Sequence, residues 1–119
     1  MSTGTQELRD RTKAFAVRIV RFLDQCHIPL IHSWLAGSCC VAALRWRQIM
    51  EPHAGGRSRA EWIAKIGLVV EEADETVFWL EMLADCDIVS GERCKDILQE
   101  ACELSAIFTA SGHTARRAG

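Results

Sequence analysis

Apolar residues recur at helical spacing along four segments of the chain, and no segment shows the alternation of apolar and polar residues that marks a strand. The breaks between the segments are short and carry proline, glycine or capping residues. The predicted helices cover residues 5–25, 33–50, 58–85 and 90–111, and residues 112–119 form a polar tail that we expect to fray.

The short links determine how such helices can pack. Helices of about twenty residues are ~30 Å long, and links this short make neighbouring helices run antiparallel. With 119 residues, 49% of them hydrophobic and 25% charged, the chain has enough apolar surface for one ordinary core. The sequence therefore predicts an all-α fold, an antiparallel up-down-up-down four-helix bundle, in a single domain that spans residues 1–119.

Each of the first two predicted helices carries a stripe of residues expected to form the core. On the first helix the stripe comprises Leu8, Thr12, Phe15, Ile19, Phe22 and Cys26, widened by Ala16, Val20 and Leu23. On the second helix it comprises Leu35, Cys39, Ala42, Trp46 and Ile49. Trp34, Val41 and Leu44 point elsewhere, so this helix is apolar nearly all round, which predicts contacts on more than one side.

The third and fourth helices have similar stripes and clear end signals. The third stripe comprises Trp62, Ile66, Val69, Ala73, Val77 and Leu80, with Ile63 and Val70 beside them. The fourth comprises Cys94, Ile97, Leu98, Ala101, Leu104, Ser105 and Phe108. Ser58 and Glu61 form a capping box before the third helix, and Ser90 is the expected N-cap of the fourth. Gly112 is the residue expected to close the fourth helix.

The stretch "EEADE", residues 71–75, places four carboxylates close together in the third helix and raises the question of a metal site. On a helical wheel Glu71 and Glu75 fall opposite the core stripe, whereas Glu72 and Asp74 fall on its two flanks. Carboxylates that diverge in this way cannot converge on one ion, and the paired Glu-x-x-His motifs of a di-metal bundle are missing from the sequence. We therefore expect a solvated acidic face, with no metal and no cofactor.

The same wheel places apolar residues beside this acidic face. Two aromatic residues among them favour a protein interface, because a cluster of this kind is unusual on a free surface. A loop or the C-terminal tail folded over the cluster is the alternative, and we prefer self-association. The predicted oligomer interface comprises Leu68, Phe78, Trp79 and Met82, together with Glu71 and Glu75.

Nothing in the sequence indicates export or a membrane. No basic region followed by an apolar core and a cleavage site is visible, so the cytoplasm is the expected location. The run from Gln25 to Leu44 lacks charges, but Pro29 and its polar neighbours favour a loop followed by a buried helix over a membrane span. The cysteines are expected to stay reduced: Cys26, Cys39, Cys40, Cys86, Cys94 and Cys102.

Charge is divided unevenly between the two halves of the chain. Residues 1–60 hold nine Lys and Arg against four Asp and Glu, a net charge of +5, whereas residues 61–119 hold five against twelve, a net charge of −7. In the predicted bundle one side is then basic and the other acidic, so copies attract one another basic side to acidic side. Such a contact is heterologous, and repeated around an axis it closes into a ring.

Arginines bracket the predicted link between the second and third helices. Other basic residues decorate the first helix, among them Lys13, Arg18 and Arg21. A basic strip can hold nucleic-acid phosphates without reading sequence, and it can equally pair with the acidic half of a neighbouring subunit. Both interpretations stay open. The candidate nucleic-acid-binding residues are Arg45, Arg47, Arg57 and Arg59.

No motif of a known catalytic site is present. The sequence has no Gly-rich phosphate loop, no Gly-x-Ser-x-Gly and no Cys-x-x-Cys. No catalytic residue is therefore assigned, and we expect a non-enzymatic scaffold or accessory protein. The alternative is a small helical-bundle enzyme or a metal-binding protein.

One block, "GRSRAEWIAKIGLVVEEADETVFWLEMLAD" (residues 56–85), resembles the third helix of a bacterial family. These are the four-helix-bundle proteins first noticed as reading frames in intervening sequences of large-subunit ribosomal RNA genes. The resemblance extends to "ELRDRTKAFAVRIVRFL" and "ILQEACELSAIFTAS" and covers about residues 6–117. Its most specific parts are Gly56-Arg57-Ser58, Glu72-Ala73-Asp74-Glu75 and Trp79-Leu80-Glu81.

The resemblance implies a compact antiparallel bundle, homo-oligomeric rings with pentamers as the expected form, and no established enzymatic activity. A related branch serves as the accessory subunit of reverse transcriptases in diversity-generating retroelements, where a basic ring contacts nucleic acid. By analogy, RNA, DNA or a nucleic-acid enzyme is the implied partner of this chain. The second helix departs from the family, because Ala36, Cys40 and Leu44 stand where arginine, serine and asparagine are expected.

Overall fold

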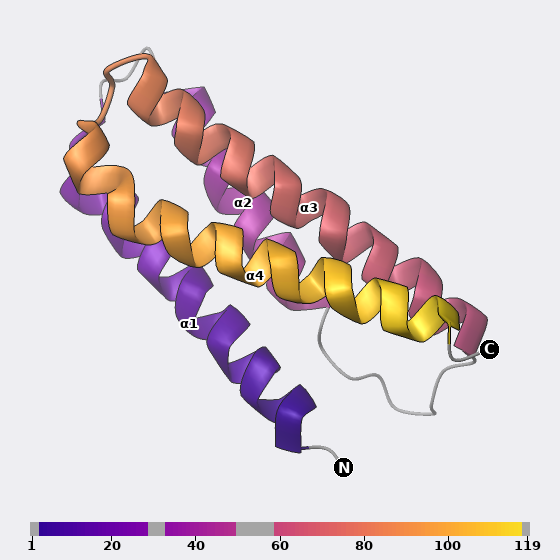
Figure 1. Cartoon of the computed structure of the whole chain (residues 1–119). Coiled ribbons are helices and arrows are strands. Elements are labelled where there is room, and N and C mark those ends of the chain that lie inside the picture. The colour runs from indigo at the N-terminus through magenta and orange to yellow at the C-terminus, as the bar shows by residue number, and fades with distance from the viewer. Residues whose placement is uncertain (1–2, 29–32, 50–58, 118–119) are drawn as a thin grey trace.

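The computed structural model describes residues 3–28, 33–49 and 59–117. Within these ranges the chain forms four helices and no strand: α1 (Thr3–Gln25), α2 (Ser33–Ile49), α3 (Arg59–Asp85) and α4 (Gly91–Arg117) (Figure 1). The helices pack into an elongated body of about 46 × 25 × 23 Å. This arrangement confirms the predicted all-helical class and is compatible with a helical bundle.

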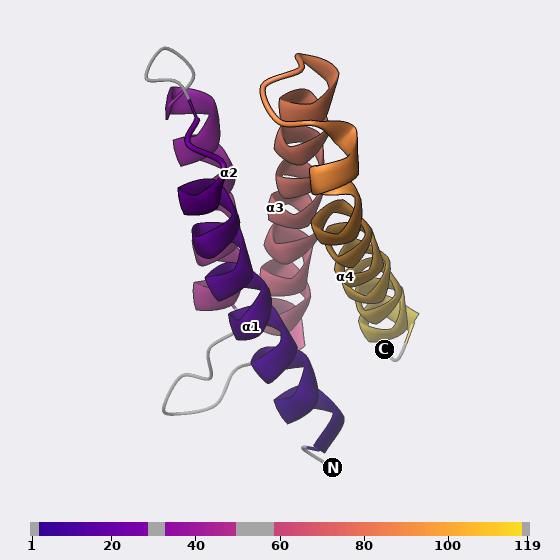
Figure 2. The same cartoon turned by 90° about the vertical axis from the view of Figure 1, so that its left-hand side faces the viewer.

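α3 is the central helix of the packing. It makes its largest contact with α4 and its second largest with α2, while α1 packs against α2 and touches α4 less extensively (Figures 1 and 2). Two cross-helix hydrogen bonds show which helix ends lie together. Arg59, at the start of α3, donates to the backbone carbonyl of Arg116 near the end of α4 at 3.2 Å. Arg93, near the start of α4, donates to the carbonyl of Gln25 at the end of α1 at 3.5 Å.

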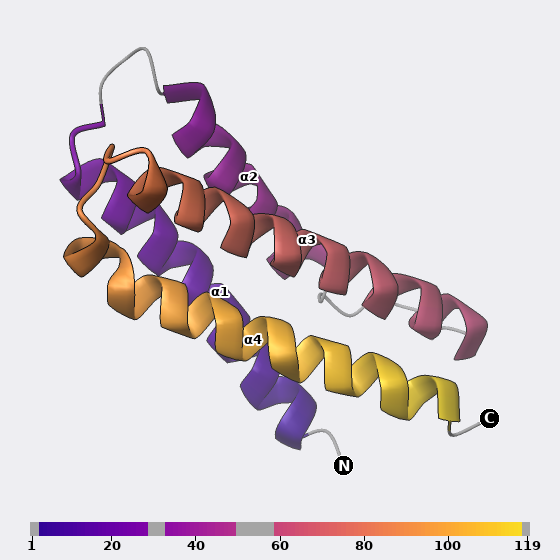
Figure 3. The same ribbon diagram turned by 45° about the horizontal axis from the view of Figure 1, so that its top comes forward.

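A tight turn joins the end of α3 to the start of α4 (Figure 3). Asp87 adopts the left-handed conformation, with φ of 58°, just after the helix ends. Its N–H donates to the carbonyl of Ala84, and the next N–H, of Ile88, donates to the carbonyl of Leu83, both at 3.0 Å. These two hydrogen bonds together form the Schellman motif, which ends a helix and reverses the chain. Ser90 then accepts the N–H of Arg93 on its side-chain oxygen at 3.3 Å, which confirms it as the N-cap of α4.

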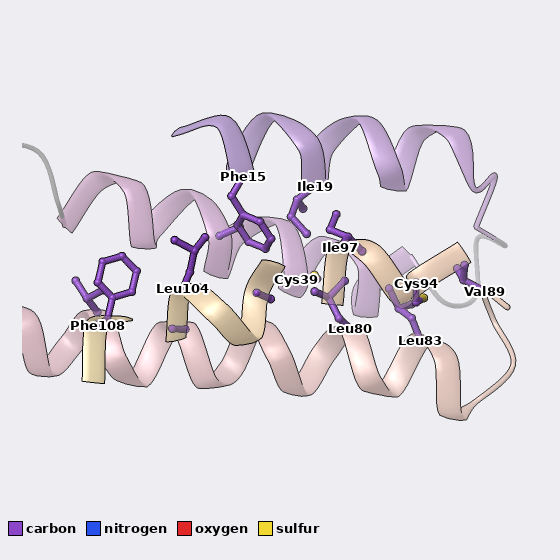
Figure 4. Close-up of a cluster of buried hydrophobic side chains, with 14 of the residues drawn as sticks. Phe15, Ile19, Cys39, Leu80, Leu83, Val89, Cys94, Ile97, Leu104 and Phe108 are labelled. Carbon is purple, nitrogen blue, oxygen red and sulfur yellow. The ribbon is translucent and has the colours of Figure 1, made fainter. Parts of the chain in front are cut away.

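The core runs along the middle of the body and draws on all four helices. Figure 4 shows Phe15 and Ile19 of α1 and Cys39 of α2 beside Leu80 of α3 and Ile97 of α4, and each of these side chains is at least 98% buried. Leu104 and Phe108 continue the core along α4 toward its C-terminal end (Figure 4). Burial of this apolar surface is the main favourable term in folding.

Most predicted core positions of the described residues are confirmed, with one exception, and one core residue lies outside the predicted stripes. Val20, expected to widen the stripe of α1, is 46% exposed. Thr76, which the predicted stripe of α3 passes over in favour of Val77, is fully buried. Its hydroxyl donates to the carbonyl of Glu72 at 2.9 Å, so the polar group is satisfied within its own helix. Thr12, correctly placed in the core, does the same to the carbonyl of Leu8 at 2.7 Å.

Some expectations fall on parts of the chain that the structure does not describe. They are the capping role of Ser58 and the burial of Leu35, Trp46 and Ile49. Within the described residues, the main difference in helix bounds lies at the C-terminus. α4 continues to Arg117 instead of closing near Gly112, so the expected frayed tail is helical as far as the structure describes it. Gly112 is buried inside the helix, on the side that faces α3.

The position of Gly112 gives a test of this longer helix. A Cβ atom at this position would lie 3.5 Å from a guanidinium nitrogen of Arg116 and 3.7 Å from a side-chain carbon of Ile66, which are ordinary contacts. Since glycine inside a helix is less favourable than alanine by roughly 0.5–1 kcal/mol, Gly112→Ala is expected to raise the free energy of unfolding by about that amount. Urea unfolding at fixed protein concentration measures the change.

The matched control is Ala110→Gly, at an exposed position of the same helix, which is expected to lower the free energy of unfolding by a similar amount, roughly 0.5–1 kcal/mol. A Gly112→Ala variant less stable than the wild type would contradict the longer helix, because a glycine that ends a helix in the left-handed conformation is destabilised by a Cβ atom.

Candidate oligomer interface and basic surfaces

The four carboxylates of residues 71–75 diverge around α3 as predicted. Glu72 accepts a salt bridge from Arg45 of α2 at 3.0 Å, on one flank of the helix. Asp74 accepts a hydrogen bond from the hydroxyl of Ser105 of α4 at 2.9 Å, on the other flank. Glu71 and Glu75 lie between these flanks and are exposed. The four carboxylates therefore point in three directions: toward α2, toward α4 and into solvent. Glu71 and Glu75 lie on the side of α3 between the two flanks and away from the core, which we call the outer edge of α3.

The predicted interface residues divide into two groups. Leu68 and Phe78 are 49% and 50% exposed and lie on the outer edge with Glu71 and Glu75, as expected. Trp79 and Met82 are half-buried and pack against the core, so their expected position facing away from the core is wrong. For Trp79 the reason is the closeness of α2, whose Trp34 meets the ring of Trp79 edge to face at a centroid distance of 5.8 Å.

A shallow groove of about 410 Å³ lies on the surface along the contact between α2 and α3. Its lining residues come from both helices: Trp34, Gly37, Ser38, Val41, Arg45, Glu72, Glu75 and Trp79. Beside it α2 presents apolar side chains at helical spacing, with Trp34 61%, Val41 55% and Leu44 41% exposed. Gly37 lies among them with open space where a Cβ atom would stand. The outer face of α2 therefore resembles a helix-packing surface without a partner helix on it.

Trp79 also carries a polar group without a partner. Its indole N–H is buried and finds no hydrogen-bond acceptor among the described residues. Phe78 packs on the same indole at a centroid distance of 5.1 Å, so Trp34, Trp79 and Phe78 form one aromatic cluster between the outer edge of α3 and the groove. The cluster joins the exposed apolar surfaces of α2 and α3.

The candidate nucleic-acid-binding arginines are only partly described. Arg45 is bound to Glu72 through one end of its guanidinium group, and its side chain is 59% exposed. Arg59 is exposed and lies at the start of α3, where it donates to the carbonyl of Arg116. Arg57 and the side chain of Arg47 lie outside the described residues. The structure therefore places two of the four arginines, one on each of the helices that flank the predicted link.

A second basic surface, which the candidate sites from the sequence do not include, lies between α1 and α4. A groove of about 760 Å³ is lined by Asp10, Lys13, Ala14, Val17, Arg18, Arg21, Phe22, Gln25, Arg93, Asp96 and Ile97. The sequence shows the cations of α1 at helical spacing. It does not show that Arg93, 72 residues after Arg21, joins them, because that closeness depends on the register between α1 and α4.

An ion cluster holds α1 and α4 together beside this groove. The guanidinium of Arg11 forms a bidentate pair with Glu100 at 2.7 and 2.8 Å and also reaches Glu103 at 2.9 Å. The hydrogen bond from Arg11 lowers the pKa of Glu100 below its ordinary value, and Arg18 lowers it further through its charge. The same pairing raises the pKa of Arg11, so both groups stay ionised at neutral pH.

The buried cysteines are poor nucleophiles. Burial raises the pKa of Cys39 to about 12, with a smaller contribution from the neighbouring Cys40. Burial also raises the pKa values of Cys26 and Cys94. Because the thiolate is the reactive form, these thiols react slowly at neutral pH. All six cysteines are free in the structure.

Searches of the described residues for two further features gave negative results. No group of three or more His, Cys, Asp and Glu side chains is arranged so that it could hold a metal ion. None of the described helices combines the length and the apolar character that crossing a membrane requires.

Comparisons with known proteins gave no match. No protein-family model matches the chain, and neither the curated proteins nor the solved structures include a match.

The ion pair of Glu100 predicts how stability depends on pH. A carboxylate whose pKa is lowered by folding stabilises the folded state fully above its unfolded pKa, about 4.3, and loses this contribution as pH falls through the folded pKa. Glu100→Gln is expected to cost about 1 kcal/mol at pH 7, and the difference from the wild type should shrink between about pH 5 and pH 3. Urea unfolding at a series of pH values measures it.

The control is Glu7→Gln, at an exposed position of α1, which should change the free energy of unfolding little at either pH. A difference between Glu100→Gln and the wild type that stays constant down to pH 3 would show that the pair with Arg11 does not lower the pKa of Glu100.

Proposed function

We propose that this protein is a non-enzymatic scaffold or accessory protein that assembles into a homo-oligomeric ring. Its protomer is proposed to be an antiparallel up-down-up-down four-helix bundle. Two contacts from α1 support this topology: Arg11 pairs with Glu100, whereas Gln25, further along α1, meets Arg93, nearer the start of α4. From α2, Trp34 meets Trp79 and Arg45 meets Glu72, again in reversed order.

The observation that carries the proposal is the apolar surface left open on α2 and α3. Four large apolar residues on these helices, Trp34, Val41, Leu68 and Phe78, are about half exposed or more, at 61%, 55%, 49% and 50%. Single exposed apolar residues are normal, but aromatic and aliphatic side chains gathered beside a groove are typical of protein interfaces. A further copy of the chain is the occupant that we propose.

The division of charge supports a heterologous contact between copies. The basic helices α1 and α2 and the acidic helices α3 and α4 give each protomer two surfaces of opposite sign. A two-fold contact would place like charges together, whereas a head-to-tail contact places opposite charges together. The resemblance to the intervening-sequence family supports a ring, with five subunits as the proposed number.

Replacement of one exposed aromatic residue tests the interface. Phe78→Lys adds a charge to a surface that is proposed to be buried between copies, so it is expected to shift the native mass from the oligomer toward the 13.3 kDa protomer at micromolar concentration. Native mass spectrometry and sedimentation velocity measure the masses. Trp79 is unsuited to this test because its half-buried ring packs against the core.

Ala106→Lys, at an exposed position of α4 outside the proposed surface, is the matched control and should assemble as the wild type does. A wild-type protein that is only a 13.3 kDa species under these conditions would overturn the proposed ring and the scaffold function with it. Stoichiometric iron, manganese or zinc in the purified protein would instead favour the alternative of a helical-bundle enzyme or metal-binding protein.

The proposed scaffold contacts RNA or a partner protein through the basic surface that includes Arg45 and Arg59. Both side chains are exposed, and each also contacts a group of the same chain: Arg45 contacts Glu72 and Arg59 contacts the carbonyl of Arg116. Guanidinium groups suit phosphate recognition because they are always charged and can donate two hydrogen bonds at once. A ring would present several copies of this surface, so weak contacts would add by multivalency.

Binding to RNA is tested by its salt dependence. If Arg45 and Arg59 contact phosphates, the affinity for a single-stranded RNA of mixed sequence falls as salt rises, and each arginine replaced by alanine lowers the slope of the logarithmic plot by about 0.7. Fluorescence anisotropy between about 50 and 300 mM salt measures the affinity and the slope. Lys95→Ala, an exposed cation on α4, is the control. Affinity that does not change with salt would leave a partner protein as the ligand of this surface.

A further inference from the structure

The groove between α1 and α4 has the chemistry of an acceptor for an acidic, partly apolar helix. Of its charged residues four are basic, Lys13, Arg18, Arg21 and Arg93, and two are acidic, so the groove is positive overall. Apolar side chains line it between the charges, contributed by Val17, Phe22 and Ile97. Its lining residues on α1 extend from position 10 to position 25, about 22 Å along the helix axis.

The cations of this groove form no salt bridge among the described residues, although the charge of Arg18 also acts on Glu100. Lys13, Arg18 and Arg21 differ in this from Arg11 and Arg45. Arg93 donates only a long bond to a backbone carbonyl. Val17, which is 41% exposed, lies between these cations on α1. The groove therefore offers charge and apolar surface that no described part of the same chain covers.

The outer edge of α3 has the complementary chemistry. From position 66 to position 92 the chain contains no lysine or arginine and eight aspartates and glutamates. Leu68, Glu71, Glu75 and Phe78 follow one another at spacings of three and four residues, so they lie on one side of the helix. All four are exposed. The edge is about 15 Å long, which is shorter than the groove.

We propose that the outer edge of α3 of one copy docks into the α1–α4 groove of the next copy. Glu71 and Glu75 would meet Arg18 and Arg21, and the apolar ends of the edge would meet the apolar lining of the groove. The inference rests on the proposed self-association and specifies its contact. Opposite charges select this partner, since α3 against α3 would bring the same carboxylates face to face.

The α1–α4 groove and the outer edge of α3 are placed so that the same contact can repeat from one copy to the next. α1 and α3 lie diagonally across the core, because their described backbones do not approach each other closely and each helix packs against α2 and α4 instead. The groove beside α1 and the edge of α3 therefore lie on different sides of the protomer, and a copy that uses one surface keeps the other free. A contact of this kind joins copies head to tail, as a closed ring requires.

Charge reversal tests the docking because all four residues are exposed. Arg18→Glu with Arg21→Glu, and separately Glu71→Arg with Glu75→Arg, are each expected to raise the dissociation constant of the assembly by about tenfold or more at low salt. The chain that carries all four changes is expected to assemble within a few fold of the wild type, because the reversed edge again meets a groove of opposite sign. Lys95→Glu with Glu92→Arg, at exposed positions of α4 outside the groove lining, is the control for charge swapping and leaves the net charge unchanged. Sedimentation velocity over a concentration series measures assembly, and circular dichroism checks that each variant keeps its helices.

The outcomes separate this inference from the proposed function. A wild-type chain that stays monomeric overturns the self-association itself. If the wild type assembles and neither charge reversal changes the mass of the assembly, only the docking of α3 in the groove is overturned. The same conclusion follows if the variant with all four substitutions does not recover assembly. Loss of RNA affinity in the Arg18→Glu, Arg21→Glu variant without loss of assembly would identify the groove as a nucleic-acid surface, and would likewise overturn the docking.

Discussion

The structure depends on the packing of α3 against a helix on each of its flanks. α4 covers one flank and α2 the other, and between them the stripe of Ile66, Val69, Ala73, Leu80 and Leu83 is buried in the core. The carboxylates of residues 71–75 follow from this placement. Glu72 binds Arg45 on the flank of α2, and Asp74 binds Ser105 on the flank of α4. Among the described residues no other element packs on the outer edge of α3, and the candidate interface includes this edge.

The periodicity of the sequence predicts most of this arrangement. Helix existence and the core stripes follow from apolar spacing, and the end of α3 at Asp85 and the start of α4 after Ser90 follow from turn and cap chemistry. Gly112 shows the limit of such signals, because a glycine near a helix end ends the helix only if the chain adopts the left-handed conformation there. In this chain tertiary packing against α3 keeps the helix intact past Gly112.

The candidate surfaces were harder to predict because they depend on where two helices sit relative to each other. A helical wheel treats α3 as a lone cylinder with one core direction, and it cannot show that Trp34 of α2 covers the side occupied by Trp79. The same lack of cross-helix information hides the closeness of Arg93 to the cations of α1. Thr76 was missed for a different reason, since its buried hydroxyl is satisfied by its own helix and needs no polar partner nearby.

The segregation of charge within the chain has two effects of different range. The pairs Arg11–Glu100 and Arg45–Glu72 join a basic helix to an acidic one inside the protomer, through direct contacts of 2.7 and 3.0 Å between charged groups. The remaining charges face outward, where the Debye length of about 8 Å at physiological salt limits their attraction to close approach. In the proposed assembly, steering between copies would therefore be sensitive to salt, whereas burial of Leu68 and Phe78 between copies would not be weakened by screening. An assembly that needs both components forms only when the apolar edge and the charged groove meet in one register.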